Sequence, residues 1–381
     1  MIVVIADDLT GAAEIGGIGI RFNLAVTMVN GVCTDRDITT DLLVINTDTR
    51  SLPRQEAMVV ISSVLDWVAK LPYSYLYKKV DSVLRGYVKD ELMLLSERFT
   101  YRRIILIPAN PLLGRVVKKG CYFVNDKLIH ETAFAMDPEF PTKTSDVLEM
   151  LGNSHTFVVK NQGEPLPDKG EIVGEVSDVD DLILWVDKIE EGTLAAGSSA
   201  FFEALLRLIL QREPTVPMAK VDLLYPQLFV CGSSFPDSIK QVKMWHKHHK
   251  SVFFLPSNTS NITKQYQSMM EWAISPIFSL FQQKKAIIAF ESDQPINLKN
   301  NAVMLRNLMA EAVTLVLNES PVKELFIEGG ATAAAILKAL GITQLYPKNE
   351  LAPGVVRCAA IGKRKLWITM KPGSYDWQSV L

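Results

Sequence analysis

The feature that most constrains the fold of this chain is a repeated alternation of short apolar runs with longer segments of helical periodicity. In the first half the runs are IVVIA, LAVTMV, LLVINT, YLYKKV, RIILIPA and HTFVVK. Continuously apolar runs are typical of strands that are buried on both faces of a mostly parallel sheet. Between them, QEAMVVISSVLDWVAKL and VKDELMLLSERF carry their charges along one side of a helix. The pattern predicts an α/β fold.

Chain length and one proline-rich segment predict two domains. The 381 residues exceed the usual size of a single domain. The segment QREPTVPMAKVDLLYPQ holds three prolines, and after it the alternation resumes with QLFVC, SVFFLP, KAIIAF, ELFIE and KLWITM. We expect an N-terminal domain at residues 1–219 and a C-terminal domain at residues 220–381. Each has a mostly parallel sheet flanked by helices, and we expect the active site in the cleft between them.

Composition excludes several classes of protein. Apolar residues make up 48% of the chain and charged residues 22%, which is typical of an ordinary folded protein. The formal net charge of -2 gives no electrostatic footprint for a nucleic acid or an anionic membrane. No run approaches the roughly 20 apolar residues that span a bilayer, and the cysteines form no CxxC pair. We expect a cytoplasmic protein that binds neither nucleic acid nor membranes.

Polar residues directly after the apolar runs are candidates for a binding site, because ligands of open α/β sheets bind beyond the carboxyl ends of the strands. These residues are Asp7, Asp8, Thr10 and Gly11 after the first run, Asn46, Asp48 and Arg50 after the third, Asp81, Ser82, Arg85 and Gly86 after YLYKKV, and Asn110, Gly114 and Arg115 after RIILIPA. Four such loops predict a cleft lined by convergent polar groups.

The adjacent acids Asp7 and Asp8 admit two interpretations. Asp8 or Thr10 can cap the following helix, which contributes about 1 kcal/mol. Alternatively, a carboxylate at a strand end orients a substrate hydroxyl or accepts its proton. One acid is enough to cap the helix. A catalytic role would explain why there is a second.

The segment KKVDSVLRG also admits two interpretations. Asp81 can cap a solvated helix, with Arg85 pairing one turn later for about 0.3 kcal/mol. Alternatively, the Arg85 guanidinium holds the carboxylate of a small acid through two parallel hydrogen bonds, and Lys79 adds a second positive charge. The spacing alone leaves both open.

In the second half, VCGSS, IEGGATAAA and MKPGSYDW each place glycine and hydroxyl groups after a strand, where glycine is also common in ordinary turns. GGAT leaves backbone N–H groups at a helix N-terminus open to a phosphate. Neither GxxxxGK[ST] nor GxGxxG occurs. His246, His248 and His249 of WHKHHK favour a solvated helix end over a metal site, because no carboxylate lies within a helical turn of them.

Together, ADDLTGA, KKVDSVLRG, IPANPLLGR with VNDKLIHETAFAMDP, VCGSS, EGGATAAA and KPG resemble, in this order, the motifs of the four-carbon acid sugar kinases. The resemblance implies an N-terminal domain that binds a tetronate-like acid and a C-terminal domain that binds ATP. The substrate residues that it implies are Asp7, Asp8, Asp81, Ser82, Arg85 and Arg115, with Gly114 at the border. The ATP residues that it implies are Ser233, Gly329, Gly330, Thr332 and Gly373.

The chain departs from the family pattern at four positions. Val83 stands where threonine is usual, Phe235 interrupts the turn after Ser233, Ala331 replaces an acid, and Pro372 replaces a serine. Valine and threonine share a shape, although the hydroxyl is lost. The other three departures lie on the nucleotide side, so they bear on ATP binding more than on the sugar-acid pocket.

The leading hypothesis is phosphoryl transfer from ATP-Mg²⁺ to a hydroxyl of a four-carbon sugar acid, of the threonate, erythronate or 3-oxo-tetronate type. Arg85 clamps the carboxylate, and Asp8 or Asp81 accepts the hydroxyl proton. Magnesium bridges phosphate oxygens, and no protein ligand for it is identified. The alternative is a sugar-acid-binding or sensor protein of the same family without catalysis. A dinucleotide-dependent dehydrogenase fits the α/β pattern but lacks the glycine fingerprint. A homodimer is a further expectation.

Overall fold

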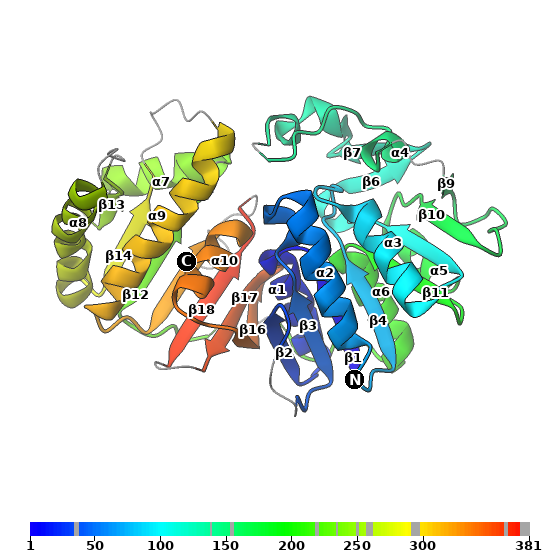
Figure 1. Ribbon diagram of the computed structural model, residues 1–381, viewed down its shortest axis with the longest axis horizontal. Helices are drawn as coiled ribbons and strands as arrows, with labels where there is room; N and C mark the ends of the chain where they lie inside the picture. Colours follow the sequence, from blue (N-terminus) through cyan, green and yellow to red (C-terminus); the bar gives the residue numbers. More distant parts are fainter. Residues whose placement is uncertain are drawn as a thin grey trace. The chain divides into compact units, whose positions relative to one another are not determined.

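The computed structural model describes residues 1–33, 38–137, 139–152, 156–217, 221–233, 235–248, 251–256, 262–290, 298–361 and 365–373. The chain forms two compact units, Met1–Pro217 and Met218–Leu381, and Figure 1 labels their helices and strands. Each unit is an α/β structure, as the sequence predicts.

Unit 1 is built on a parallel sheet. Its strand order is β2 (Val26–Asn30), β3 (Leu42–Asn46), β1 (Ile2–Ala6), β4 (Tyr75–Lys79), β11 (Thr193–Gly197), β5 (Arg103–Ile107), β10 (Gly170–Gly174) and β9 (Phe157–Lys160). Every neighbouring pair is parallel. The strands β1, β3, β4 and β5 are buried throughout or nearly so. Continuous burial is why these segments read as unbroken apolar runs.

Helices cover both faces of this sheet. They are α1 (Leu9–Arg21), α2 (Arg54–Val68), α3 (Val88–Phe99), α4 (Val147–Met150), α5 (Val179–Val186) and α6 (Ser199–Leu210). The β1–α1–β2 crossover runs in the opposite direction along the sheet from β3–α2–β4 and β4–α3–β5. Since such crossovers are right-handed, α1 lies on one face and α2 and α3 lie on the other. In agreement, α1 packs with α6, and α2 packs with α3.

A small antiparallel sheet sits at one end of unit 1, above the parallel sheet in Figure 1. It consists of β6 (Arg115–Lys118), β7 (Cys121–Val124) and β8 (Lys127–Leu128). Two short 3-10 helices follow, Ile129–Glu131 and Ala133–Met136. This insertion carries Arg115, Tyr122 and Phe134 to the carboxyl ends of the parallel strands.

Unit 2 is built on a mixed sheet. Its order is β13 (Val252–Phe254), β14 (Lys285–Ala289), β12 (Gln227–Cys231), β15 (Glu324–Glu328), β18 (Leu366–Lys371), β17 (Val355–Ala360) and β16 (Gln344–Ala352). The first five strands are parallel, and β17 and β16 continue the sheet antiparallel. The rings of Phe229 and Phe326 stack 4.3 Å apart in its core.

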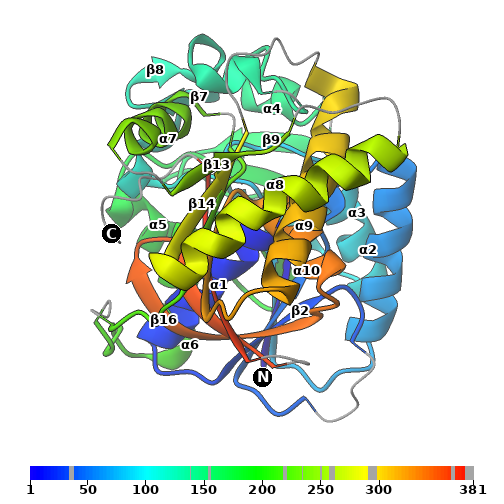
Figure 2. The same ribbon diagram turned by 90° about the vertical axis from the view of Figure 1, so that its left-hand side faces the viewer.

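The helices of unit 2 are α7 (Pro236–His248), α8 (Ile262–Gln282), α9 (Leu298–Asn318) and α10 (Gly330–Ala339). Helix α9 packs against both α8 and α10, and α7 packs against β13. Figure 2 shows α8 and α9 crossing in front of the sheet. Among the described residues, none of the helices combines the length and the apolar composition that crossing a membrane requires.

Candidate functional site

The adjacent acids at the end of β1 point to opposite faces of the sheet, because side chains along an extended segment alternate. Asp8 belongs to the α1 face, where it is the N-cap residue: its Oδ1 accepts from the Gly11 amide at 3.0 Å and its Oδ2 from the Thr10 hydroxyl at 2.5 Å. Asp7 belongs to the face covered by α2 and α3. The capping interpretation thus holds for Asp8, and Asp7 needs another explanation.

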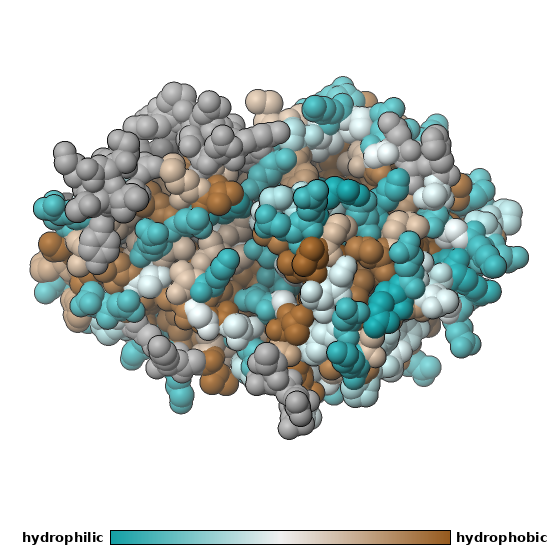
Figure 3. All heavy atoms as spheres, in the orientation of Figure 1, coloured by the Kyte–Doolittle hydropathy of each residue, from teal (hydrophilic) through white to brown (hydrophobic). Residues whose placement is uncertain are grey.

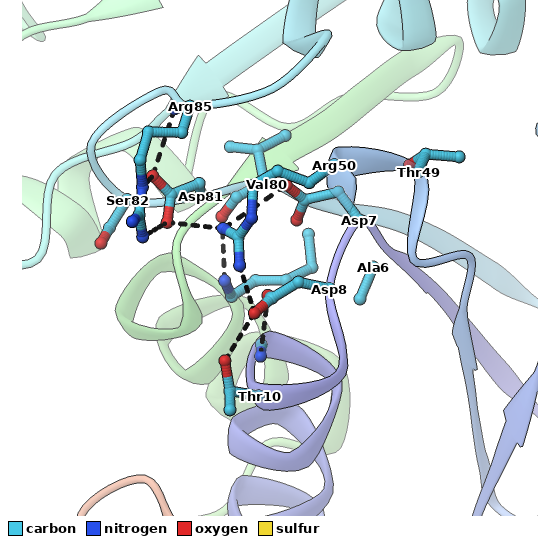
Figure 4. A network of polar contacts seen from close by, with 12 residues as sticks. Ala6, Asp7, Asp8, Thr10, Thr49, Arg50, Val80, Asp81, Ser82 and Arg85 are labelled. Carbon is cyan, nitrogen blue, oxygen red and sulfur yellow. Dashed lines mark hydrogen bonds and ion pairs between the residues drawn. The ribbon is translucent and has the colours of Figure 1, made fainter. Parts of the chain in front are cut away.

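A single guanidinium, that of Arg50, connects three aspartates from two loops (Figure 4). Its Nη1 lies 2.9 Å from Asp81 Oδ1 and 3.8 Å from Asp7 Oδ2. Its Nη2 pairs with Asp8 Oδ2. Arg50 reaches this position from the short 3-10 helix Thr49–Ser51 after β3, and its amide donates to the carbonyl of Asp7. Arg50 was not among the substrate residues implied by the family resemblance, although the sequence places it in a polar loop after a strand.

Arg85 is held by two carboxylates. Its Nε and Nη2 bond Asp81 at 2.8 and 2.9 Å, and its Nη1 bonds Asp137 Oδ2 at 2.9 Å. The residues from Asp81 to Tyr87 form turns rather than a helix, so the solvated-helix interpretation of KKVDSVLRG is wrong. The pair has helical spacing but lies in a buried turn, with the Asp81 side chain 9% exposed.

Arg115 is the third arginine of this site, after Arg50 and Arg85. It donates to the hydroxyl of Ser82, and its guanidinium lies 5.6 Å from the ring centre of Phe134, which also contacts Arg85. Tyr122 donates to the Ser82 carbonyl and fixes that turn. Within the described part of the chain, no carboxylate is found within ion-pair distance of Arg115, in contrast to Arg50 and Arg85. Arg115 is therefore the arginine here whose charge is still available to an anion.

The three aspartates differ in their affinity for protons. Burial raises the pKa of Asp81, but Arg85 and Arg50 outweigh it and hold that pKa far below its usual range. Burial likewise raises the pKa of Asp8, yet Arg50, Lys79 and the Thr10 hydroxyl bring it below the ordinary value. For Asp7, burial prevails over the more distant Arg50 and raises the pKa to about 6. Both Asp7 oxygens are buried without a hydrogen-bond partner among the described residues.

A buried ion pair of a lysine and a glutamate lies next to this site. Lys78 Nζ lies 2.6 Å from Glu91 Oε2, and the other Glu91 oxygen accepts from the Thr49 hydroxyl at 2.6 Å. Both charged side chains are at most 1% exposed. The pair joins the start of α3 to β4 and to the segment that carries Arg50, so it positions that arginine.

Gly86 allows the turn after Arg85 to approach the acids. Its φ of +91° is one that residues with a side chain rarely adopt, and a Cβ there would lie 3.3 Å from Arg50 Cγ and 3.6 Å from Asp7 Oδ2. A larger residue would press on the two groups that the site depends on.

In unit 2, the predicted nucleotide residues gather at the carboxyl ends of three neighbouring strands. Ser233 follows β12, Gly329, Gly330 and Thr332 follow β15, and Gly373 follows β18. The Ser233 hydroxyl bonds the Gly373 carbonyl at 3.3 Å, and the Gly329 amide donates to the Lys371 carbonyl at 2.9 Å. The structure thus brings all five into one part of unit 2.

The start of α10 has the geometry of a phosphate cradle. Its N-cap is Gly329, with φ +93° and no side chain to occupy the first N–H groups of the helix. Thr332 is 4% exposed and packs against Gly232, where a Cβ would lie 2.4 Å from the Thr332 hydroxyl oxygen. The amides of Gly330 and Ala331 are therefore available to a phosphate, whereas Thr332 holds the β12 turn close to the helix.

A charged pair that the sequence analysis missed lies at the same strand ends. Lys371 Nζ is 2.5 Å from Glu328 Oε1, which also accepts from the Ser238 hydroxyl at 2.7 Å. Both charged side chains are at most 1% exposed. A charged residue immediately before each glycine turn, in IEGG and MKPG, was the signal that could have found them.

Metal-binding clusters are absent from the described residues: no group of three His, Cys, Asp or Glu side chains lies close enough to hold an ion. Arg50 supplies the positive charge at the centre of the three aspartates. His246 and His248 lie in the last turn of α7, and His249 lies outside the described residues. The helix-end interpretation of the described histidines therefore stands.

One α/β unit gathers acids and arginines, and the other has a glycine-rich helix start without a side-chain cap. Both are parts that a two-domain phosphotransferase needs. Comparison with known proteins gives the family. Residues 2–205 match the model of a sugar-binding N-terminal domain, and residues 228–375 match that of a nucleotide-binding C-terminal domain. The chain belongs to the four-carbon acid sugar kinases, which transfer phosphate to an alcohol group.

Individual relatives agree with this assignment. The chain is 24% identical to a D-threonate kinase of Salmonella typhimurium, over 92% of this chain and 89% of that protein. It is also 24% identical to a 3-oxo-tetronate kinase of Brucella melitensis, over 99% and 93%. A crystal structure from Salmonella typhimurium, described as a putative tRNA synthase, has the same fold, with a TM-score of 0.73 and 20% identity over 98% of this chain and 96% of that one.

Proposed function

We propose that the protein phosphorylates a hydroxyl of a four-carbon sugar acid, with ATP-Mg²⁺ as the phosphate donor. The observation that carries the proposal is the meeting of Asp7, Asp8 and Asp81 around Arg50 at the strand ends of the sugar-binding unit. The names of the relatives, D-threonate kinase and 3-oxo-tetronate kinase, support the acid class. Carboxylates of fixed position accept hydrogen bonds from sugar hydroxyls and so orient the one that reacts.

In this proposal Arg115 binds the substrate carboxylate, together with Arg85. Arg85 already has Asp81 and Asp137 as partners, so an incoming carboxylate has to share it. Arg115 bonds only the neutral Ser82 hydroxyl among its described contacts, and its planar fork suits a carboxylate. The clamp predicted for Arg85 alone is thus extended to a pair of arginines that both contact the Phe134 ring.

The proton of the substrate hydroxyl needs an acceptor whose carboxylate oxygen is not already engaged in a strong ion pair. The sequence predicts Asp8 or Asp81, and this stays a prediction. The close ion pairs of Asp8 and Asp81 weaken both as bases. Asp7 lies farther from Arg50, at 3.8 Å, has no hydrogen-bond partner among the described residues, and has a pKa of about 6, close to the operating pH of a base. We therefore propose Asp7 as the proton acceptor, with Asp8 and Asp81 holding Arg50 and Arg85 in place.

On the nucleotide side, the amides of Gly330 and Ala331 at the start of α10 hold ATP phosphates. The buried pair of Glu328 and Lys371 fixes the two glycine turns on either side of the cradle. Magnesium, when bound to the phosphates, neutralises charge that develops during transfer. Phosphoryl transfer asks for positioning and charge rather than covalent help from the protein, and these residues provide both.

An ADP-release screen over threonate, erythronate and 3-oxo-tetronate stereoisomers tests the proposal. We expect turnover with one four-carbon acid well above the rates with three- and five-carbon acids. Isothermal titration calorimetry with the acid and with ATP separates the non-catalytic alternative. Tight binding of an acid, together with no ATP binding at millimolar nucleotide, would refute the kinase proposal.

A further inference from the structure

Phe134 of the insertion contacts both arginines that we assign to the substrate carboxylate. The guanidinium carbon of Arg85 lies 5.7 Å from the centre of its ring, and that of Arg115 lies 5.6 Å from it. Both distances are within the range of a cation–π interaction. Figure 3 shows hydrophilic side chains along the upper edge of unit 1, where the insertion lies. Phe134 is only 6% exposed, so its ring belongs to the interior of the site rather than to that surface.

The backbone fixes the position of this ring. Phe134 lies in the 3-10 helix Ala133–Met136, and the hydroxyl of the N-cap residue Thr132 accepts a hydrogen bond from its amide at 3.4 Å. The carbonyl of Phe134 accepts from the amide of Thr142 at 3.1 Å and from that of Asp137 at 3.3 Å. These bonds hold the turn on both sides of the residue. The ring therefore has a defined place before any ligand binds.

The same segment neutralises one arginine and not the other. Asp137 directly follows the 3-10 helix, and its Oδ2 accepts from Arg85 Nη1 at 2.9 Å. Arg85 also pairs with Asp81. Among the described residues, Arg115 instead contacts a neutral hydroxyl and the Phe134 ring. A carboxylate cancels the charge of a guanidinium, whereas an aromatic ring has no net charge and attracts the cation through its quadrupole.

We propose that Phe134 is a positioning residue for the substrate: its ring holds the Arg115 guanidinium in place for the carboxylate of the acid without neutralising its charge. This rests on the proposed function, because it concerns how that acid is bound. An arginine side chain loses rotamer freedom when a ligand fixes it, and a side chain that is already fixed binds at lower cost. A carboxylate in place of the ring would also fix Arg115, but it would compete with the substrate. An aromatic ring meets both requirements.

A role of Phe134 in packing alone makes a different prediction. Methionine is apolar, similar in volume and adaptable, so it fills the space of a buried ring. It lacks the negative face that attracts a guanidinium. Tyrosine keeps that face. If packing alone matters, Phe134→Met should bind the acid as the wild type does; if the ring positions Arg115, only Phe134→Tyr should.

Calorimetric titration of the full chain with threonate, erythronate and 3-oxo-tetronate, together with steady-state kinetics, tests the proposal. Phe134→Met should raise the Kd and the KM for the acid about 10-fold, as expected for the loss of a buried cation–π contact. Its kcat and its KM for ATP should stay within about 2-fold of the wild type, because the ring acts on acid binding alone. Phe134→Tyr should bind the acid like the wild type. Titrations well below the melting temperature of each variant keep a loss of stability from counting as a loss of affinity.

The matched control is Phe140→Met. Phe140 follows shortly after Phe134 in the chain, and its ring contacts that of Tyr87 at 5.9 Å. This variant loses a ring of the same size from the same part of unit 1, and it should keep the wild-type Kd for the acid. A loss as large as that of Phe134→Met would overturn the assignment to Phe134.

Coupling between the ring and the arginine tests the mechanism. In the Arg115→Ala background, Phe134→Met should raise the KM for the acid by less than about 3-fold, because the side chain that the ring positions is already gone. Packing alone would give the full loss in both backgrounds. Wild-type affinity in Phe134→Met, equal losses in Phe134→Met and Phe134→Tyr, or the full loss beside Arg115→Ala would each overturn the proposal.

Failure of this proposal and failure of the proposed function give different results. An acid that binds the wild type without ADP release refutes phosphorylation of that acid, and the Kd values of the variants still decide the role of Phe134. A wild type that binds none of the acids refutes both.

Discussion

Replacing Asp7 by asparagine should make the protein more stable relative to the wild type as the pH rises. Asp7 is 4% exposed, and burial raises its pKa from 3.8 to about 6. Between these values the folded protein holds a proton that the unfolded chain has released, so raising the pH through this window favours unfolding. The two pKa values differ by about 2 units, which corresponds to about 3 kcal/mol of unfolding free energy. The wild type loses this stability as the pH rises, and Asp7→Asn does not.

The assay is urea denaturation of the wild type and Asp7→Asn at several pH values between 4 and 8. The difference in unfolding free energy between the two proteins cancels the pH dependence of all other groups. It should shift by up to about 3 kcal/mol in favour of the variant from pH 4 to pH 8. Asp66→Asn, an acid whose side chain is 67% exposed, is the control for substitution alone. A pH-independent difference would refute the view that Asp7 carries a buried, poorly compensated charge.

Four further predictions concern activity and two buried ion pairs, Asp8 with Arg50 and Glu328 with Lys371. As the proton acceptor, Asp7 has to be ionised, so kcat should fall as the pH drops through about 6, and Asp7→Asn should lower kcat by about 100-fold or more, measured by coupled ADP release. Asp8→Asn breaks a buried pair and should instead cost about 3 kcal/mol of stability in urea denaturation. Arg115→Ala should raise the KM for the acid with little change in kcat, and a fall in kcat at unchanged KM contradicts its binding role. Lys371→Met leaves Glu328 unpaired and should raise the KM for ATP and lower the melting temperature; adding Glu328→Gln should recover stability.

The sequence predicts the parallel core of the fold because its strands are buried on both faces. Segments such as IVVIA and RIILIPA are recognised from apolar residues alone, and β1 and β5 lie within them. It misses β10 (GEIVG) and β11 (TLAAG), whose glycine and alanine residues dilute the apolar signal. These strands are defined by hydrogen bonds to β5, which a local pattern does not contain.

The sequence predicts which of these residues lie together at the strand ends, but not how their side chains are connected. Asp7, Asp8, Asp81 and Arg85 are recognised from loops after strands, and the structure does bring them together. The sequence does not show that Arg50 connects them. Such a contact joins residues 31 positions apart, as between Arg50 and Asp81, and depends on side-chain directions that only the folded sheet sets.

Because Asp7 and Asp8 point in opposite directions, the role of each acid depends on its exact position along the chain. Deleting one residue before Asp7 would move Asp8 to the place of Asp7 beside Gly86 and leave Leu9 at the cap position of α1. Inserting one residue would move Asp7 to the cap position and remove the acid beside Gly86. At the end of this strand, whether a residue stands at an odd or an even position decides which face its side chain reaches. Two identical neighbouring residues therefore have different roles.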